Sequence, residues 1–524
     1  MSTRWRQILP WLTAAALLII TFINTIRDWP KVPPFSVEED PSGDYLQALY
    51  QHQHGLQMGG YWSFSTNMRM LGPAYVWTLV AGGKIATAIG GLDWFVLGAA
   101  VACVTVALAS LVYAAWIVGR VWGPVSGWSL AAIFSVFTNF DSDHMSLFVT
   151  PHGLQTGAPN LVSPVWGPML ATPFMVVAVV AMLGFVSKRR YGVTAVLFSG
   201  LSGGVYWSHL PLAVLVLAVL IATAITDHIR TRRPLTWGRR QIMFLVGYMI
   251  GWGPATYRLI RERQGVLARD SVDTFLSRDS SPQVSELLML PGKNTGVIFV
   301  CWLALLCVVL GFMYKKWRYT LLAASVANMW FLYELYNIKR DPVGAHIAYW
   351  YVQALLILGG WALAYAVARL WMKLPAGETM VIIVLCLSTL LPSLLMNQHA
   401  PSVLYRLMVL KEPGTGDSSP LLTGLENRSI RISWALGSKQ SMLPFLLAAR
   451  TQGFDICVTG NGDAYPDTSC RTHARKGDVQ LILAPEQEPP SEQDGYRMLG
   501  VYHSHYGDRT VWARDVTTEV TTKR

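Results

Sequence analysis

The chain has 524 residues, of which 52% are hydrophobic and only 14% are charged, and its mean hydropathy is +0.35. Several apolar runs of about 18 residues or more exclude a water-soluble globular protein and indicate a protein that crosses a membrane several times. The formal charge of +11 does not indicate nucleic-acid binding, because the basic residues form short clusters between the apolar runs, as in cytoplasmic loops of membrane proteins.

The first apolar run, residues 8–26, follows Arg4 and Arg6. It is longer than the core of a signal peptide and lacks a small-x-small cleavage site, so we expect it to remain as an anchor with a cytoplasmic amino terminus. Further spans are expected at 94–118, 122–139, 169–187, 192–207, 209–226, 242–257, 296–314, 319–336, 347–371 and 378–396. With about eleven crossings, the Lys and Arg clusters between spans all fall on one side of the membrane.

One more apolar run, Ala74 to Leu92, is long enough to span, but counting it would move every later arginine cluster outside. We therefore expect a juxtamembrane or re-entrant helix on the outer side. The same arrangement predicts a large vestibule that faces away from the cytosol. Its walls would be the outer loops 27–93, 140–168, 258–295 and 337–346.

The composition changes after Met396, which separates an all-α polytopic membrane domain, 1–396, from a polar segment, 397–524. Strand-like runs and one helix-like run predict that this segment is a small extracytoplasmic α/β domain. The strands are expected at 429–434, 455–458, 479–483 and 511–514, and the helix at 439–450. The domain has two cysteines, Cys457 and Cys470. A disulfide between them is reasonable in an oxidising compartment, and a pair of buried thiols is the alternative.

Carboxylates are concentrated in the first outer loop, just after the first span. They are Glu38, Glu39, Asp40 and Asp44. Such a cluster is costly beside lipid and therefore indicates a partner or a function. A tyrosine-bearing amphipathic stretch follows, then Arg69, and then Gly72-Pro73, which opens the expected in-plane helix.

This order of features resembles the GT-C superfamily of membrane glycosyltransferases, in particular the aminoarabinose transferase and protein mannosyltransferase group. In that group an acidic site in the first outer loop is followed by a tyrosine, a helix and a basic residue before Pro-Pro. The resemblance extends through Phe137. Two features depart from it: the adjacent Asp-Glu pair is replaced by Glu38-Glu39-Asp40 and Asp44, and Lys-Pro-Pro is replaced by Arg69-Met-Leu-Gly-Pro73.

The resemblance implies an inverting transfer of a sugar from a polyprenyl-phosphate donor. Such a donor carries its own leaving group, so the protein must remove a proton from the acceptor hydroxyl and stabilise the departing phosphate. Asp44 is the candidate base, with Asp40 as an equal alternative and Glu39 behind them. The structural alternative is that Ser42 or Asp44 caps a helix that starts near Tyr45.

For the donor phosphate, Arg69 is the first candidate, because a guanidinium can bind phosphate oxygens with two hydrogen bonds. Other candidates for substrate binding are Tyr45, His209, Arg258, Lys339 and Arg340. The alternative for the basic residues is an anchor at the lipid headgroups, and Arg340 could simply pair with Asp341. His209 could face the vestibule or be a satisfied histidine at the start of a helix.

A second acidic group, Asp141, Asp143 and His144, begins the next outer loop. Two carboxylates and an imidazole could hold Mg²⁺ or Mn²⁺, and an Asp-x-Asp here is similar to the second acidic motif of oligosaccharyltransferases, which are metal-dependent GT-C enzymes. A capping cluster at a helix end is the alternative, and the Trp-Trp-Asp acceptor motif of those enzymes is not found in the chain. The proposed transfer requires no cofactor, and a divalent metal stays an open alternative.

The sequence therefore predicts a GT-C-like glycosyltransferase that acts in cell-envelope glycan biosynthesis, on a polyprenyl-phosphate sugar donor and a glycan, lipid or protein acceptor. Its surroundings are membrane lipids, and no nucleic acid is expected. The alternatives are a transporter or flippase of lipid-linked glycans, an oligosaccharide ligase, and a non-catalytic assembly protein. The lack of eukaryotic-looking targeting and retention signals favours a bacterial inner (plasma) membrane.

Overall fold

The computed structural model describes four long stretches of the first half of the chain, shorter pieces of the middle and most of the carboxy-terminal segment. The described residues are 39–56, 72–139, 167–185, 191–205, parts of 221–253 and 361–387, 418–434, 439–458, 473–485, 495–503, 508–517 and 520–521. The chain divides into two compact units. One combines Met1–Ile23 with Val104–Ala400, and the other combines Asn24–Cys103 with Pro401–Arg524.

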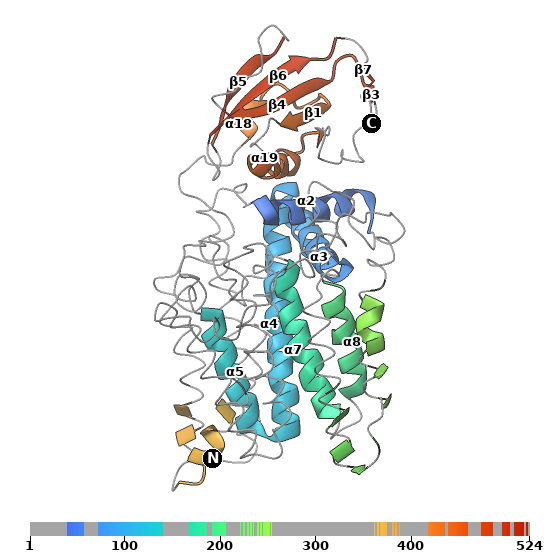
Figure 1. Ribbon diagram of the computed structural model, residues 1–524. Coiled ribbons are helices and arrows are strands. Elements are labelled where there is room, and N and C mark those ends of the chain that lie inside the picture. Colours follow the sequence, from blue (N-terminus) through green and yellow to red (C-terminus); the bar gives the residue numbers. More distant parts are fainter. Residues whose placement is uncertain are drawn as a thin grey trace, which may run out of the picture. The chain divides into compact units, whose positions relative to one another are not determined.

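The first unit is helical in its described part. Its long helices are α4 (Phe95–Trp122), whose first residues belong to the other unit, α5 (Pro124–Asn139), α7 (Gly167–Phe185) and α8 (Tyr191–Gly203). They coincide with four of the expected spans, with ends displaced by a few residues. The helices α7 and α8 run alongside each other (Figure 1), and the Ser202 hydroxyl of α8 donates a hydrogen bond to the Ala171 carbonyl of α7 at 3.3 Å.

Close packing of small residues joins the helices of this unit. A Cβ atom at Gly251 would collide with the Gly200 carbonyl, and one at Gly247 would collide with the Val196 backbone. Because Gly247 and Gly251 are four residues apart, they lie on one helix face and let the backbone of α8 approach closely, as small residues do in membrane helices.

Within the described residues, one helical stretch is long and apolar enough to cross a membrane: Leu92–Trp122, with 31 residues and mean hydropathy 2.5. It combines the short 3-10 helix η3 (Leu92–Trp94) with α4. Seven other spans are expected, and most of their residues lie outside the described part of the chain. These spans are 8–26, 209–226, 242–257, 296–314, 319–336, 347–371 and 378–396. The count of eleven crossings therefore stays a prediction.

The second unit contains two further helices from residues 27–93, the expected first outer loop. They are α2 (Glu39–His54) and α3 (Pro73–Gly90). Pro73 stands at the first position of α3, where its missing N–H costs nothing. The helix ends at Gly91, whose φ of 85° suits a residue without a side chain, and the Gly91 N–H donates to the Thr87 carbonyl at 3.0 Å. The helix expected at 74–92 is confirmed, whereas its orientation to the membrane stays a prediction.

The carboxy-terminal part of the second unit is built on a five-stranded mixed sheet in the order β2-β1-β4-β6-β5. The strands are β1 (Ile430–Trp434), β2 (Ile456–Val458), β4 (Val479–Pro485), β5 (Arg497–Tyr502) and β6 (Arg509–Asp515). The strand β1 pairs in parallel with β2 and β4, and β6 pairs antiparallel with β4 and β5. A separate two-stranded ladder joins β3 (His473–Ala474) to β7 (Val520–Thr521).

One helix, α19 (Lys439–Thr451), connects the parallel strands β1 and β2, and a shorter one, α18 (Ser419–Leu422), precedes β1 (Figure 1). The side chains of α19 are buried from Ser441 to Thr451. The Phe445 ring packs edge-on against the Tyr502 ring of β5, with 5.0 Å between the ring centroids. The helix also packs against α2. The expected strands and the expected helix are therefore present in the described residues, whereas a separate domain 397–524 on the outer side of the membrane stays a prediction.

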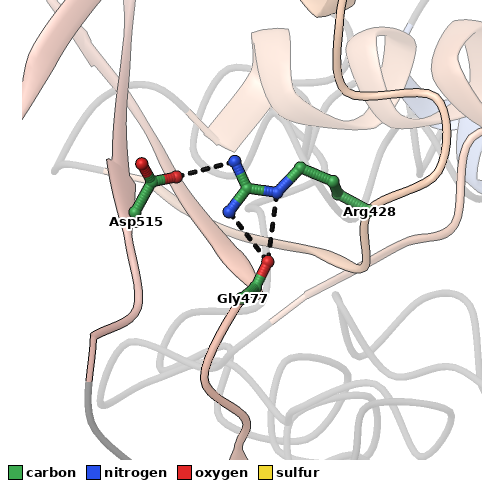
Figure 2. Close-up of polar contacts among 3 residues, drawn as sticks. All are labelled: Arg428, Gly477 and Asp515. Atoms are coloured by element: carbon green, nitrogen blue, oxygen red, sulfur yellow. Dashed lines mark hydrogen bonds and ion pairs between the residues drawn. The ribbon is translucent and has the colours of Figure 1, made fainter.

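An arginine joins three segments of this sheet at one end (Figure 2). The Arg428 guanidinium donates from Nε and Nη2 to the Gly477 carbonyl, at 3.1 and 2.8 Å, and its Nη1 lies 2.7 Å from Asp515 Oδ1. The ion pair is partly exposed and contributes little by itself. The two hydrogen bonds link Arg428, two residues before β1, to the turn before β4, and thereby hold these two segments together.

Candidate active site

The helix α2 carries the acidic residues of the first outer loop. Glu39 and Asp40 are its first residues, and Asp44 lies in its second turn. The helix therefore begins five residues before Asp44, not near Tyr45 as the capping alternative required. That alternative is wrong for Asp44, because a capping side chain must precede the first turn that it caps. Pro41 is tolerated here because it lies in the first turn.

Asp44 is buried, with 8% of its surface exposed. The hydroxyl of Tyr75, from the first turn of α3, donates a hydrogen bond to Asp44 Oδ2 at 3.1 Å. A carboxylate removed from water needs such donors, because the cost of burying an unpaired charge is large. The contact between α2 and α3 thus places a supported acid inside the protein.

Two tyrosines stand next to this acid, and both are almost fully buried. Burial raises the pKa of Tyr75 well above its ordinary value, and the neighbouring charge of Asp44 raises it further. Burial also raises the pKa of Tyr45, with smaller contributions from Cys103 and Asp44. Both phenols therefore stay protonated near neutral pH and can act as hydrogen-bond donors. The Tyr45 hydroxyl is buried and makes no hydrogen bond to any residue that the structure describes.

The histidines of α2 belong to its far end. The ring of His52 lies against Phe95 of α4, with 5.4 Å between the centroids, and burial followed by the charge of Lys84 lowers the pKa of His52. His54 Nδ1 is 3.0 Å from the Tyr50 carbonyl one turn earlier. On a helix the side chains of His52 and His54 diverge. Within the described stretches of the chain, no three His, Cys, Asp or Glu residues gather as metal ligands would.

The remaining sequence-predicted residues divide into two groups. Cys457 is in β2 and is disulfide-bonded. Its partner was predicted to be Cys470, which lies outside the described residues, so the pairing stays a prediction. The side chains of Glu39 and Asp40 are also outside them. The same holds for Arg69, Asp141, Asp143, His144, His209, Arg258, Lys339 and Arg340. Of the predicted catalytic and substrate-binding residues, the structure describes the side chains of Asp44 and Tyr45.

One residue of the site escaped the sequence reasoning. Tyr75 lies 31 positions after Asp44 and two residues after Pro73, which opens the expected in-plane helix. No spacing rule predicts a hydrogen bond between residues so far apart. The signal that was present is its place near the start of a helix that directly follows the acidic loop.

The comparisons with known proteins concern the fold. No protein-family model and no curated protein matches the sequence. Among solved structures, ArnT from Cupriavidus metallidurans bound to undecaprenyl phosphate matches over 98% of each chain, with a TM-score of 0.57 and 14% identity. The same protein in the apo state matches over 96% of this chain and 97% of its own, with a TM-score of 0.54 and 14% identity.

The oligosaccharyltransferase of Archaeoglobus fulgidus in its apo form is more distant. It has a TM-score of 0.47 and 11% identity, and covers 85% of this chain and 65% of its own. The match to ArnT over nearly the whole chain confirms the GT-C fold that the resemblance of the segment through Phe137 implies.

Proposed function

We propose that the chain is an inverting glycosyltransferase, which moves a sugar from a polyprenyl-phosphate donor to a glycan, lipid or protein acceptor on the outer side of the membrane. The observation that carries the proposal is the buried Asp44 carboxylate with the Tyr75 hydroxyl as its donor, in a chain with the fold of ArnT. The ArnT structure contains undecaprenyl phosphate, which supports a donor of this chemical class.

Asp44 is the base in this mechanism. Its carboxylate takes the proton of the acceptor hydroxyl while the acceptor oxygen attacks the anomeric carbon of the donor sugar. The bond between that carbon and the phosphate oxygen breaks, and the polyprenyl phosphate leaves with the electron pair. A buried carboxylate suits this role because few water molecules compete with the acceptor at its oxygens.

The leaving phosphate requires positive charge. Arg69 is proposed as its main ligand, with Lys339, Arg340 and Arg258 as further cations of the outer loops. His209 and the buried Tyr45 are proposed to contact the donor. The step needs no cofactor, and a divalent metal held by Asp141, Asp143 and His144 is the alternative way to neutralise the phosphate. The segment 397–524 is proposed to help bind the acceptor.

The decisive test is sugar transfer by the purified protein in detergent, from a panel of polyprenyl-phosphate sugars. Asp44→Asn keeps the shape of the side chain but cannot accept the proton at neutral pH, so transfer should fall by about 100-fold or more while donor binding stays. Asp40→Asn tests Asp40, the other candidate for the base. The matched control is Asp93→Asn, because Asp93 is an exposed acid of η3.

The outcome separates the rival functions. Two outcomes would favour a transporter or flippase: the wild type binds a donor but transfers no sugar, or both Asp44→Asn and Asp40→Asn transfer sugar normally. In either case the carboxylates have a structural role. Transfer of a preassembled oligosaccharide, with no transfer of single sugars, would indicate a ligase.

A further inference from the structure

The mechanism above assigns no role in the reaction to the hydroxyl of Tyr75. Tyr75 is fully buried, and its hydroxyl donates to Asp44 Oδ2 at 3.1 Å. Burial alone does not give a phenol such a bond: the hydroxyl of Tyr45, which is also buried, makes no hydrogen bond to any residue in the described part of the chain. Of these two buried tyrosines, Tyr75 is the one whose hydroxyl is bonded to the Asp44 carboxylate.

The backbone that holds Tyr75 is fixed more firmly than a loop would be. Tyr75 belongs to the first turn of α3, and α3 lies so close to α4 that a Cβ atom at Gly82 would meet the Gly98 carbonyl and Ala102. A Cβ atom at Gly98 of α4 would likewise collide with the Cβ atom of Ala86 in α3. Because Tyr75 is fully buried on a helix that packs this closely, its hydroxyl can hold one rotamer of the carboxylate.

From this geometry we propose that Tyr75 is a positioning residue for the reaction: its hydroxyl holds the Asp44 carboxylate in one orientation and favours its ionised form. The inference rests on the proposed function, since it concerns the base of that reaction. Both effects follow from one bond. A donor fixes the oxygen that it contacts, and a hydrogen bond to a carboxylate stabilises the ionised form more than the protonated form.

Other titratable residues lie on α2 and on the neighbouring helices, and the test must take them into account. They are Glu39, Asp40, Tyr45 and His52 on α2, Tyr75 and Lys84 on α3, Cys103 on α4, and Lys439 and Arg450 on α19. Arg450 is engaged elsewhere, since its Nε donates to the Ile456 carbonyl at 2.8 Å. Replacing Tyr75 by Phe changes none of the others, so a shift in the pH dependence of Asp44 reports the lost bond.

The expected effect of Tyr75→Phe has a definite sign. Without the donor the ionised carboxylate is less favoured, so the acidic limb of the kcat/KM profile should move to higher pH by about one unit. At a pH on that limb, transfer should fall about tenfold, whereas KM for the donor should change less than about twofold, because positioning acts on the reacting group and not on binding.

A second substitution at the same position should produce the opposite shift. Difluorotyrosine is a stronger hydrogen-bond donor than tyrosine and has nearly the same shape. At position 75 it should move the acidic limb to lower pH. Opposite shifts from two substitutions that preserve the ring exclude a mere loss of folding. The matched control is Tyr113→Phe, which removes a tyrosine hydrogen bond, 3.2 Å long, to Thr194 of α8, and should leave the limb in place.

A spectroscopic readout makes the test independent of turnover. The carbonyl stretch of the protonated Asp44 carboxyl can be assigned by infrared difference spectroscopy as the band that Asp44→Asn removes. In Tyr75→Phe this band should change frequency and persist to higher pH. A band and a pH profile that both equal those of the wild type would overturn the proposal.

The proposed function can fail separately from this inference. If the band shifts as expected but the wild type transfers no sugar from any donor, the bond exists and the glycosyltransferase assignment is wrong, and a role in catalysis falls with it. If the wild type transfers sugar and the band does not shift, the function stands and the positioning role of Tyr75 is wrong.

Discussion

Asp44 and Tyr45 show that two consecutive buried residues of one helix can have different hydrogen-bonding environments. Both are adjacent in α2 and both are buried, yet Asp44 accepts a hydrogen bond from Tyr75 whereas Tyr45 keeps a buried hydroxyl without a bond to any described residue. An unsatisfied buried hydroxyl is unfavourable for folding. Such a cost is accepted where the group has a function, which fits the proposal that Tyr45 contacts the donor.

Tyr45→Phe should therefore separate stability from function. The thermal midpoint should stay equal or rise, because a buried polar atom without a bond is removed. KM for the donor should rise about tenfold if the hydroxyl contacts it. Measuring both on the same preparation is sufficient, with Tyr113→Phe as the control for a lost tyrosine hydroxyl. An unchanged KM would mean that Tyr45 only fills the core.

The two buried tyrosines also predict the alkaline behaviour of the protein. Their pKa values are raised in the folded state, so the stability that they contribute is fully present below the ordinary tyrosine pKa of about 10 and is lost as the pH rises through the folded values. Thermal midpoints measured between about pH 8 and pH 11 should fall less steeply in Tyr45→Phe than in the wild type. Parallel curves would contradict this linkage.

At the scale of elements, the packing of α3 on α4 decides where Tyr75 lies. Gly82 and Gly83 face Gly98 and Phe95 with no space for a side chain. The apolar run 74–92 predicted a helix, but periodicity alone does not say which face meets a neighbour so closely. The stretch Ala81 to Lys84 shows the contrast, because Gly82 and Gly83 are buried while Ala81 and Lys84 are exposed.

Gly82→Leu should disrupt this contact, whereas Ala81→Leu adds a similar bulk on the exposed side and serves as the control. We expect Gly82→Leu to lower the free energy of unfolding by about 1–3 kcal/mol or more, with a lower thermal midpoint and weaker transfer, because α3 must move away from α4. Ala81→Leu should change neither by a comparable amount. Equal effects of the two substitutions would show that the helices do not pack as described.

At the scale of the whole molecule, the first outer loop and the carboxy-terminal segment fold together. The compact unit that contains 401–524 also contains 24–103, and α19 packs against α2. The helix α2, which carries the proposed base, therefore packs against two helices of its own unit. One is α3, which follows it in the chain, and the other is α19, from the carboxy-terminal segment. The carboxy-terminal segment is in this sense part of the support of Asp44.

A truncation after Met396 should therefore not leave an active membrane domain. Without α19, the buried side chains of α2 are exposed, so the segment around Asp44 should lose its protection in hydrogen exchange and transfer should be abolished. The control is the full chain with the exposed substitution Arg497→Ala in β5. A truncated protein with normal transfer and unchanged protection of 39–56 would refute this dependence.

The sequence by itself determined most of the described helices and strands. Apolar runs predicted five helices that the structure describes, α3, α4, α5, α7 and α8, because long apolar stretches satisfy their backbone polar groups by forming helices. Alternating residues predicted β1, β2, β4 and β6, and a helical pattern predicted α19. The strand β5 and the short ladder of β3 and β7 were missed, since exposed and brief strands carry little alternation.

Only the tertiary structure decided how the site is held. The acidic cluster identified Asp44 as a candidate, yet its helix, its burial and its partner Tyr75 depend on α2 meeting α3 across a gap of 31 residues, and on α19 arriving from beyond position 400. Local patterns report the conformation of neighbouring residues, whereas a hydrogen bond between distant residues depends on packing that only the folded chain provides.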